Sequence, residues 1–244
     1  MEERCADPRS LGAAVWRRQT VRNQEAGHEL AAAAKQGNTA RFYSPDNLGK
    51  LSVESVQEVQ AISLDEAAER YGFTDAAFLK LDTQGTELDI LKSGSRLLPA
   101  VQAIYVEAAF QPFYCDQPLF ADVDSFMRAN GFVLFALNRT AIRRHAGHRP
   151  SVYTQHMVAW AHCLYIREPD ASEDREALVR LLALAVSLQC FDVAFEVAAR
   201  LHLPDTVDAE IQRCAAFATR VMLDGDDSPE ALAALTARVS RDKG

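Results

Sequence analysis

Short apolar runs alternate with amphipathic stretches through the middle of this 244-residue chain. Phe78–Leu81 and Val101–Val106 have the length and composition of buried strands, and Gly72 and Gly131 follow stretches with helical spacing. The expected elements are strands at 56–64, 78–81, 101–106, 132–137 and 157–167 and helices at 65–71, 86–92 and 118–130. This alternation predicts an α/β fold with a mostly parallel sheet, helices on its faces and an antiparallel edge strand. The two successive strands at 132–137 and 157–167 suit an antiparallel pair at that edge.

The character of the chain differs at its two ends. Residues 1–29 are polar and give only a weak helical pattern, whereas residues after Pro169 are rich in Ala, Leu and Val. The latter predict helices at 173–202, 205–223 and 229–241. We therefore expect a poorly defined segment over 1–29, an α/β domain over 30–168 and a helical C-terminal extension over 169–244, to which no chemistry is assigned.

Composition narrows the classes of partner. A formal net charge of -8 disfavours general attraction to nucleic acid or anionic lipid. The N-terminus lacks the apolar region of a signal peptide, and no apolar run has the length of a membrane helix. The expectation is a soluble, cytoplasmic protein that binds neither nucleic acid nor membrane.

The pattern of cysteines and histidines in the sequence does not indicate a metal site. The five cysteines are odd in number and far apart, without a C-x-x-C pair, so reduced thiols are expected rather than disulfides or structural zinc. His145, His148 and His156 belong to a basic loop and are expected at the surface. His162 lies within a predicted strand, where we expect a buried or edge residue. No metal is predicted.

Two carboxylates are expected where consecutive strands end. Asp82 follows Phe78–Leu81 and precedes a turn, Gln84-Gly85, while Glu107 closes the run at Val106. Ligands of open parallel sheets bind beyond the carboxyl ends of the strands, and neighbouring strands lie about 5 Å apart. The two carboxylates are therefore expected to share one pocket.

A structural alternative stands beside this interpretation. An acidic residue before or in the first turn of a helix is favoured by capping and by the helix dipole, which applies to Asp82 and to Glu87. Thr86 with Asp89 also resembles a capping box. Glu107 has less of a structural explanation, because a carboxylate at the end of an apolar strand is costly to bury without a partner or water.

The combined sequence of this region resembles the FkbM family of S-adenosylmethionine-dependent methyltransferases. The resemblance lies in Leu64-Asp65, in FLKLDTQGTELDILKSG (Phe78–Gly94) and in the segment Ile104–Phe132. The matching positions are Leu64-Asp65, Lys80-Leu81-Asp82, Gln84-Gly85, Glu87, Leu91-Lys92, Glu107, Pro112, Tyr114, Gln117-Pro118-Leu119-Phe120 and Gly131-Phe132. The resemblance implies a Rossmann-like class I methyltransferase sheet, S-adenosylmethionine as cofactor, and transfer of a methyl group to a hydroxyl of a sugar or other secondary metabolite.

The resemblance also implies which residues form the site. They are Asp82, Gln84 and Gly85 beside the cofactor, Glu87 and Glu107 as catalytic carboxylates, and Tyr114 and Gln117 on the side of the small-molecule or glycan acceptor. Simple packing of Tyr114 under its loop remains the alternative for that residue.

One part of the family pattern is not found. A glycine-rich segment after a first strand is expected for close approach of the backbone to the cofactor, and the glycines before residue 62 are isolated. The expectation is a domain that is incomplete on its N-terminal side, which leaves enzymatic activity open. The alternative function is an inactive methyltransferase remnant that serves as a protein-interaction module, with a possible homo-oligomer because an inner strand edge would be exposed.

Overall fold

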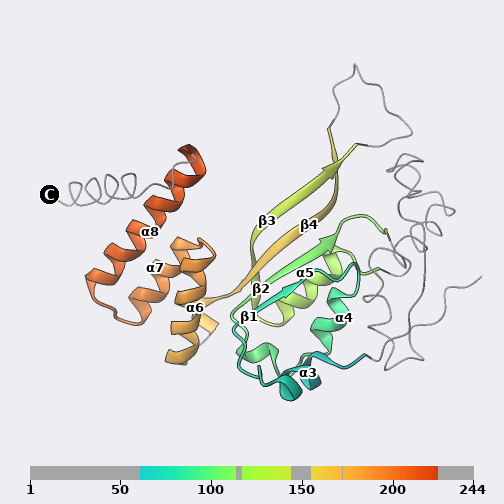
Figure 1. Ribbon diagram of the computed structural model, residues 1–244, viewed down its shortest axis with the longest axis horizontal. Coiled ribbons are helices and arrows are strands. Elements are labelled where there is room, and N and C mark those ends of the chain that lie inside the picture. The colour runs from blue at the N-terminus through green and yellow to red at the C-terminus, as the bar shows by residue number, and fades with distance from the viewer. Residues whose placement is uncertain (1–60, 114–116, 144–154, 172, 225–244) are drawn as a thin grey trace, which may run out of the picture. The chain divides into compact units, whose positions relative to one another are not determined.

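A computed structural model of the chain describes residues 61–113, 117–143, 155–171 and 173–224 (Figure 1). The chain divides into two compact units, one ending at Ile166 and the other beginning at Arg167. The segment 1–29, most of the strand expected at 56–64 and the helix expected at 229–241 lie outside the described residues. Residues 61–63 have no regular structure, and a helix begins at Leu64.

The first unit is built on a four-stranded sheet with the order β1-β2-β4-β3. Its strands are β1 (Phe78–Leu81), β2 (Ala103–Ala109), β3 (Phe132–Ile142) and β4 (Met157–Arg167). β1 and β2 are parallel, whereas β4 runs antiparallel to β2. β3 and β4 lie together at one edge of the sheet, as expected for the strands at 132–137 and 157–167. The strand that is antiparallel to β2 is not the outermost one, because the chain leaves β3 and returns to pair with β2, which places β4 between them.

Two strands extend beyond their predicted ends. β2 continues to Ala109, because Ala108 and Ala109 pair with Ala161 and Trp160 of β4. Glu107 therefore lies within β2 and does not end it. β3 likewise runs on to Ile142, five residues past the predicted end at Leu137. Pairing with a neighbouring strand determines where these strands end, and the local hydrophobic pattern does not predict that pairing. The bounds of β1 and β4 agree with the predictions at 78–81 and 157–167.

The described part of this unit contains the α-helices α3 (Leu64–Tyr71), α4 (Glu87–Lys92) and α5 (Phe120–Ala129) and the short 3-10 helix η4 (Leu98–Ala100). The Ser63 hydroxyl accepts a hydrogen bond from Glu66 N at the start of α3, and Gly72 ends it with φ 73, a left-handed conformation that suits glycine. Ser63 and Gly72 confirm the helix predicted at 65–71, with one additional residue at its start.

α4 and α5 lie against one face of the sheet (Figure 1), and their side chains share an apolar core with that face. Leu88 and Leu91 of α4 and Met127 of α5 pack in one cluster with Ile104 and Val106 of β2. Successive side chains of a strand point to opposite faces. Tyr105 and Glu107, which alternate with these core residues, therefore point to the other face of the sheet, where both are partly exposed.

A polar contact ties α5 to β4 from within this core. Tyr165 is fully buried, and its hydroxyl donates a hydrogen bond to Asp124 Oδ1 over 3.1 Å. The other oxygen of Asp124 accepts from Arg128 Nε at 2.8 Å. Burial, with the negative charge of Asp124 second, raises the pKa of the Tyr165 hydroxyl, so Tyr165 remains a neutral donor.

The second unit contains the short 3-10 helix η5 (Pro169–Ala171) and the helices α6 (Arg175–Ser187), α7 (Phe191–Arg200) and α8 (Asp205–Asp224). The single helix predicted at 173–202 is wrong, because the chain breaks between α6 and α7. Gln189 adopts φ 61, and Cys190 N donates to Ala185 O over 2.7 Å, which closes the end of α6. No helix in the described part of the chain is long and apolar enough to cross a membrane.

The described cysteines are free thiols. Cys163 and Cys190 are buried and Cys214 is exposed. Burial raises the pKa of the Cys163 thiol to about 12, with the charge of Asp124 as the second cause, so this thiol is unreactive. Cys5 and Cys115 lie outside the described residues.

Candidate functional site

Asp82, Glu107 and His162 lie in one row across three strands. In the parallel pair Leu81 is the partner of Val106, so the next residues, Asp82 and Glu107, are neighbours. In the antiparallel pair Glu107 is the direct partner of His162. Partner residues in a sheet point to the same face. The strand register therefore brings the three side chains together on the face opposite the core.

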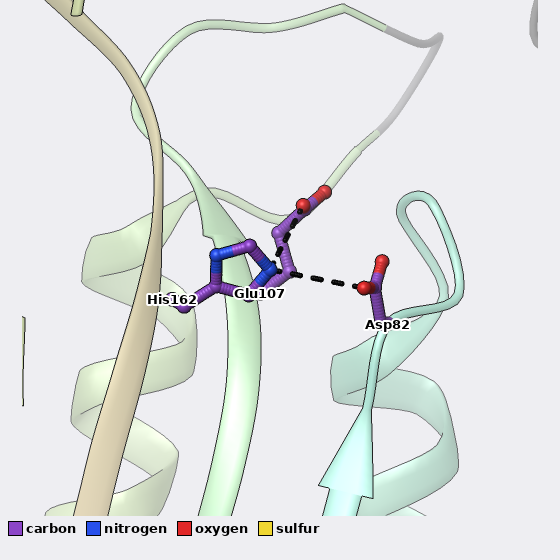
Figure 2. Close-up of side chains that lie close together, drawn as sticks. All are labelled: Asp82, Glu107 and His162. Atoms are coloured by element: carbon purple, nitrogen blue, oxygen red, sulfur yellow. Dashed lines mark ion pairs between the residues drawn. The ribbon is translucent and has the colours of Figure 1, made fainter. Parts of the chain in front are cut away.

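The three side chains converge without forming hydrogen bonds to one another (Figure 2). His162 Nε2 lies 3.7 Å from Asp82 Oδ2 and 3.6 Å from Glu107 Oε2, and both separations are longer than a hydrogen bond. The side chains are 37% exposed for Asp82, 18% for Glu107 and 28% for His162, so a ligand could reach all three. The His162 ring stacks on Tyr105, with a centroid distance of 5.4 Å and an interplanar angle of 5°.

Gln84 connects the two carboxylates from the turn after β1. Its Nε2 donates to Asp82 Oδ1 at 3.2 Å and to Glu107 Oε1 at 3.4 Å. Its backbone has φ 60, a left-handed conformation that costs a residue other than glycine about 1 kcal/mol or more. Gly85, which follows, has φ 108 and supplies the freedom that the turn needs. The amide of Gln84 thus occupies one oxygen of each carboxylate, while the other oxygen of each faces His162.

Glu87 stabilises this turn through hydrogen bonds to its backbone. Only 5% of the residue is exposed, and its carboxylate accepts hydrogen bonds from Thr83 N at 2.7 Å and from Gly85 N at 2.9 Å. Both of its oxygens are therefore engaged by the backbone. The geometry favours the structural alternative for Glu87. Thr86 makes no side-chain cap at the start of α4, so the expected capping box with Asp89 is not formed.

Negative charge accumulates in the row, because two carboxylates lie close together. Burial raises the pKa of Glu107 to about 7, and the negative charges of Asp82 and then Glu87 add to the effect. Asp82 caps no backbone N–H among the described residues; its contacts are with Gln84 and His162. The row is an anionic site in which a bound cation would be stabilised.

The remaining predicted site residues fall on the loop after β2. Gln117 Oε1 accepts a hydrogen bond from Phe113 N at 3.0 Å. Phe113 is buried and meets Trp160 edge to face at 5.8 Å. Tyr114 lies outside the described residues. The roles predicted for Tyr114 and Gln117 on the acceptor side stay predictions.

His162 is the member of the row that the sequence did not reveal as a site residue. Its position on an apolar strand suggested a buried or edge side chain, and only the pairing of β4 with β2 places it opposite Glu107. The histidines of the basic loop were expected at the surface, and one of them, His156, is described and exposed. His156 contacts Arg143, with 3.4 Å between Nε2 and Nη2, and His145 and His148 lie outside the described residues.

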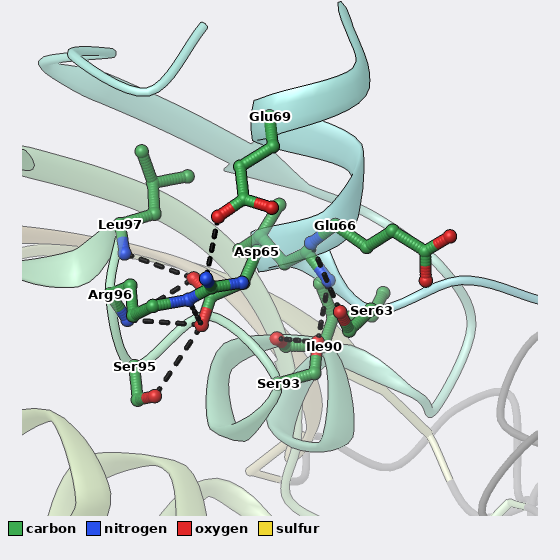
Figure 3. Close-up of polar contacts among 10 residues, drawn as sticks. Ser63, Asp65, Glu66, Glu69, Ile90, Ser93, Ser95, Arg96 and Leu97 are labelled. Carbon is green, nitrogen blue, oxygen red and sulfur yellow. Dashed lines mark hydrogen bonds and ion pairs between the residues drawn. The ribbon is translucent and has the colours of Figure 1, made fainter.

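A second carboxylate, Asp65 at the start of α3, has very different surroundings (Figure 3). It is 8% exposed and accepts hydrogen bonds from Arg96 N at 3.1 Å and Leu97 N at 3.0 Å, while Arg96 Nε lies 3.3 Å away. Burial by itself would raise its pKa, but these donors outweigh burial, and the pKa of Asp65 lies below its usual value. Asp65 connects α3 to the loop after α4, and its contacts among the described residues include no residue of the row.

One comparison with known proteins identifies a family. A family model described as the Methyltransferase FkbM domain matches residues 11–134, just over half of the chain. The matched range includes β1, α4, β2 and α5, and therefore Asp82, Gln84 and Glu107. It ends before β4 and His162. No curated protein and no solved structure matches the chain.

Proposed function

Because the chain belongs to the FkbM methyltransferase family, we propose that it uses S-adenosylmethionine to methylate a hydroxyl oxygen of a sugar or other secondary metabolite. The observation that carries the proposal is the convergence of Asp82 and Glu107 from neighbouring parallel strands onto one exposed face. Ligands of Rossmann-like sheets bind beyond the carboxyl ends of parallel strands. Asp82 directly follows β1, and Glu107 lies two residues before the end of β2, so both side chains are near that edge of the sheet. We accordingly assign β1 and β2 to a Rossmann-like class I sheet, with α4 as the helix that follows β1.

The residues of the row suit the charge of this cofactor. S-adenosylmethionine supplies a methyl group on a sulfonium, which carries a positive charge. Asp82 and Glu107 form a partly buried anionic site, where the pKa of Glu107 is raised to about 7 by burial and by nearby negative charge. A cation beside these carboxylates would relieve that destabilisation, because opposite charges within about 4–6 Å favour the charged form.

We assign the roles by position. Asp82, Gln84 and Gly85 border the cofactor, since they form the turn between β1 and α4. Glu107 is the catalytic carboxylate that binds and orients the acceptor hydroxyl, because it projects from β2 toward the open face. Positioning of donor and acceptor can supply several kcal/mol of the barrier. Glu87 acts as a positioning residue through the turn.

Tyr114 and Gln117 complete the proposal on the acceptor side. They belong to the loop that follows β2, and Gln117 already fixes the start of that loop through Phe113 N. A small-molecule or glycan acceptor would lie between this loop and Glu107. Residues 1–60, in which the family pattern would place a glycine-rich segment, lie outside the described residues, and the family match begins at residue 11.

The test is direct binding of S-adenosylmethionine to the purified full-length chain, measured by titration calorimetry. Binding should weaken at least tenfold in Asp82→Asn and stay unchanged in Glu176→Gln, a matched control on α6, where Glu176 is exposed. Circular dichroism would establish that each variant is folded. A folded wild-type chain that releases no heat at millimolar ligand would contradict the proposal and favour the alternative of a non-catalytic interaction module.

A further inference from the structure

We infer that Asp82, Glu107 and His162 form a site for a divalent metal ion, and that this ion holds an acceptor through two neighbouring oxygen atoms. Each residue offers one ligand atom, and these atoms lie within 4.8 Å of one another. Binding of the ion stands on this geometry alone, whereas its role toward an acceptor rests on the proposed function.

The spacing of the ligand atoms is close to that of ligands around one ion. Zinc lies about 2.0–2.2 Å from nitrogen and oxygen ligands, so two ligands of a tetrahedral site are about 3.4 Å apart. His162 Nε2 is 3.6 Å from Glu107 Oε2 and 3.7 Å from Asp82 Oδ2. Both separations exceed a hydrogen bond and are a few tenths of an ångström from the ion geometry. The ligand oxygens of Asp82 and Glu107 lie within 4.8 Å of each other, so a bound ion would draw the two carboxylates closer together.

Contacts around the three residues orient their ligand atoms. Gln84 donates to Asp82 Oδ1 and Glu107 Oε1, which leaves Oδ2 and Oε2 facing His162 Nε2. Tyr105 stacks on the His162 ring and fixes its plane. Such outer contacts set the direction of metal ligands and tune their affinity. The left-handed backbone of Gln84 is maintained despite its cost, which agrees with a requirement for this amide.

An ion pair of protonated His162 with the two carboxylates is the competing explanation. A single Nε2–H cannot donate well to two oxygens, and neither oxygen is within hydrogen-bonding distance. A dication in contact with all three ligands instead balances both carboxylate charges. The two explanations differ in one measurable respect: the metal site binds added metal ions, whereas the ion pair does not require them.

The ligand set indicates the class of ion and of substrate. Imidazole suits zinc, iron and nickel, and carboxylates suit manganese and magnesium, so a mixed set fits a first-row ion such as Mn²⁺ or Zn²⁺. Three protein ligands leave positions open, as in catalytic metal sites. A vicinal diol or a hydroxyl beside a carbonyl would fill two of them and place one oxygen for methylation.

The experiment titrates Mn²⁺ into the full-length chain after treatment with a chelator and its removal, without cofactor. Calorimetry should give one site, and the electron paramagnetic resonance signal of free Mn²⁺ should fall as the ion is bound. Zn²⁺ should displace it. His162→Gln should weaken Mn²⁺ binding at least tenfold, while His156→Gln, an exposed control in the same unit, should leave it unchanged.

A second variant keeps the test independent of the ligands themselves. Gln84→Asn retains a residue that tolerates a left-handed backbone but shortens the amide, and outer-contact changes weaken metal binding by about 10–100-fold. No Mn²⁺ or Zn²⁺ binding by the folded chain, or equal binding by wild type and His162→Gln, would overturn the inference. Titration of S-adenosylmethionine in chelator separates the two proposals, since cofactor binding without metal binding rejects only the ion, and the converse rejects only the cofactor.

Discussion

Asp65 and Glu107 are two largely buried carboxylates of the same unit with opposite electrostatics. Both are penalised by burial, yet the pKa of Asp65 is lowered and that of Glu107 is raised to about 7. The difference lies in their partners. Asp65 accepts from two backbone N–H groups and a guanidinium, whereas Glu107 has a side-chain amide, a histidine and the charge of Asp82. A carboxylate that accepts several hydrogen bonds from the protein stabilises the fold, whereas one with few hydrogen-bond donors can bind a ligand.

The largest expected effect is the loss of stability in Asp65→Ala. The substitution leaves the N–H groups of Arg96 and Leu97 without their acceptor, and we expect the free energy of unfolding to fall by about 3 kcal/mol. Urea denaturation followed by circular dichroism measures it. Glu69→Ala removes only the exposed partner of Arg96 and should cost less than about 1 kcal/mol. Equal losses in both variants would show that Asp65 is no anchor.

Glu107→Gln should separate activity from stability. Removing a charge that burial and Asp82 destabilise should leave the free energy of unfolding unchanged or raise it by up to about 1 kcal/mol. Methyl transfer, once an acceptor is known, should fall about 100-fold, which corresponds to about 2.7 kcal/mol. Denaturation and initial-rate measurements on the same preparation check both. A variant that is strongly destabilised would place Glu107 with Asp65 as a structural residue.

Tyr165→Phe tests the structural role of Asp124, a carboxylate that contacts neither the Asp82–Glu107–His162 row nor Asp65. It removes the hydroxyl that donates to Asp124, and about 1 kcal/mol of stability should be lost. Because Tyr165 points into the core, the affinity for Mn²⁺ and for S-adenosylmethionine should not change. A change in either affinity with little loss of stability would contradict this assignment.

The smallest expected effect is the acid dependence of the Asp65 contribution. The pKa of Asp65 is lower in the folded chain than in the unfolded chain, so its contribution is full above the unfolded value, about 3.9, and is lost as the pH falls through the folded value. The difference in unfolding free energy between wild type and Asp65→Asn should thus be constant near neutrality and shrink below about pH 4. Denaturation at several pH values measures this difference. A difference that grew on acidification would have the wrong sign.

Local patterns were sufficient for much of the fold. Phe78–Leu81 and Met157–Arg167 were predicted with the bounds observed, and the parallel relation of the first two strands predicted that Asp82 and Glu107 would be neighbours. What local patterns could not give is pairing between distant segments. The pairing of β4 with β2 extends β2 beyond Glu107 and brings His162 opposite it.

Three further features depend on backbone conformation or on contacts that sequence patterns do not specify. The family resemblance implied that Glu87 is catalytic, and only the folded turn shows that both of its oxygens accept hydrogen bonds from backbone N–H groups. The break between α6 and α7 depends on the left-handed conformation of Gln189, a residue type that ordinarily continues a helix. Asp65 matched the family pattern, but its partners lie about 30 residues further along the chain.

The antiparallel placement of β4 has a consequence for biosynthesis. Asp82 and Glu107 emerge early in translation, while His162 lies on the last strand of the sheet, which must insert between β2 and β3. Contacts between segments so distant in sequence form late and slow folding. A nascent chain that stops before Met157 would carry both carboxylates without their imidazole, so maturation of the row is deferred until the sheet closes around its final strand.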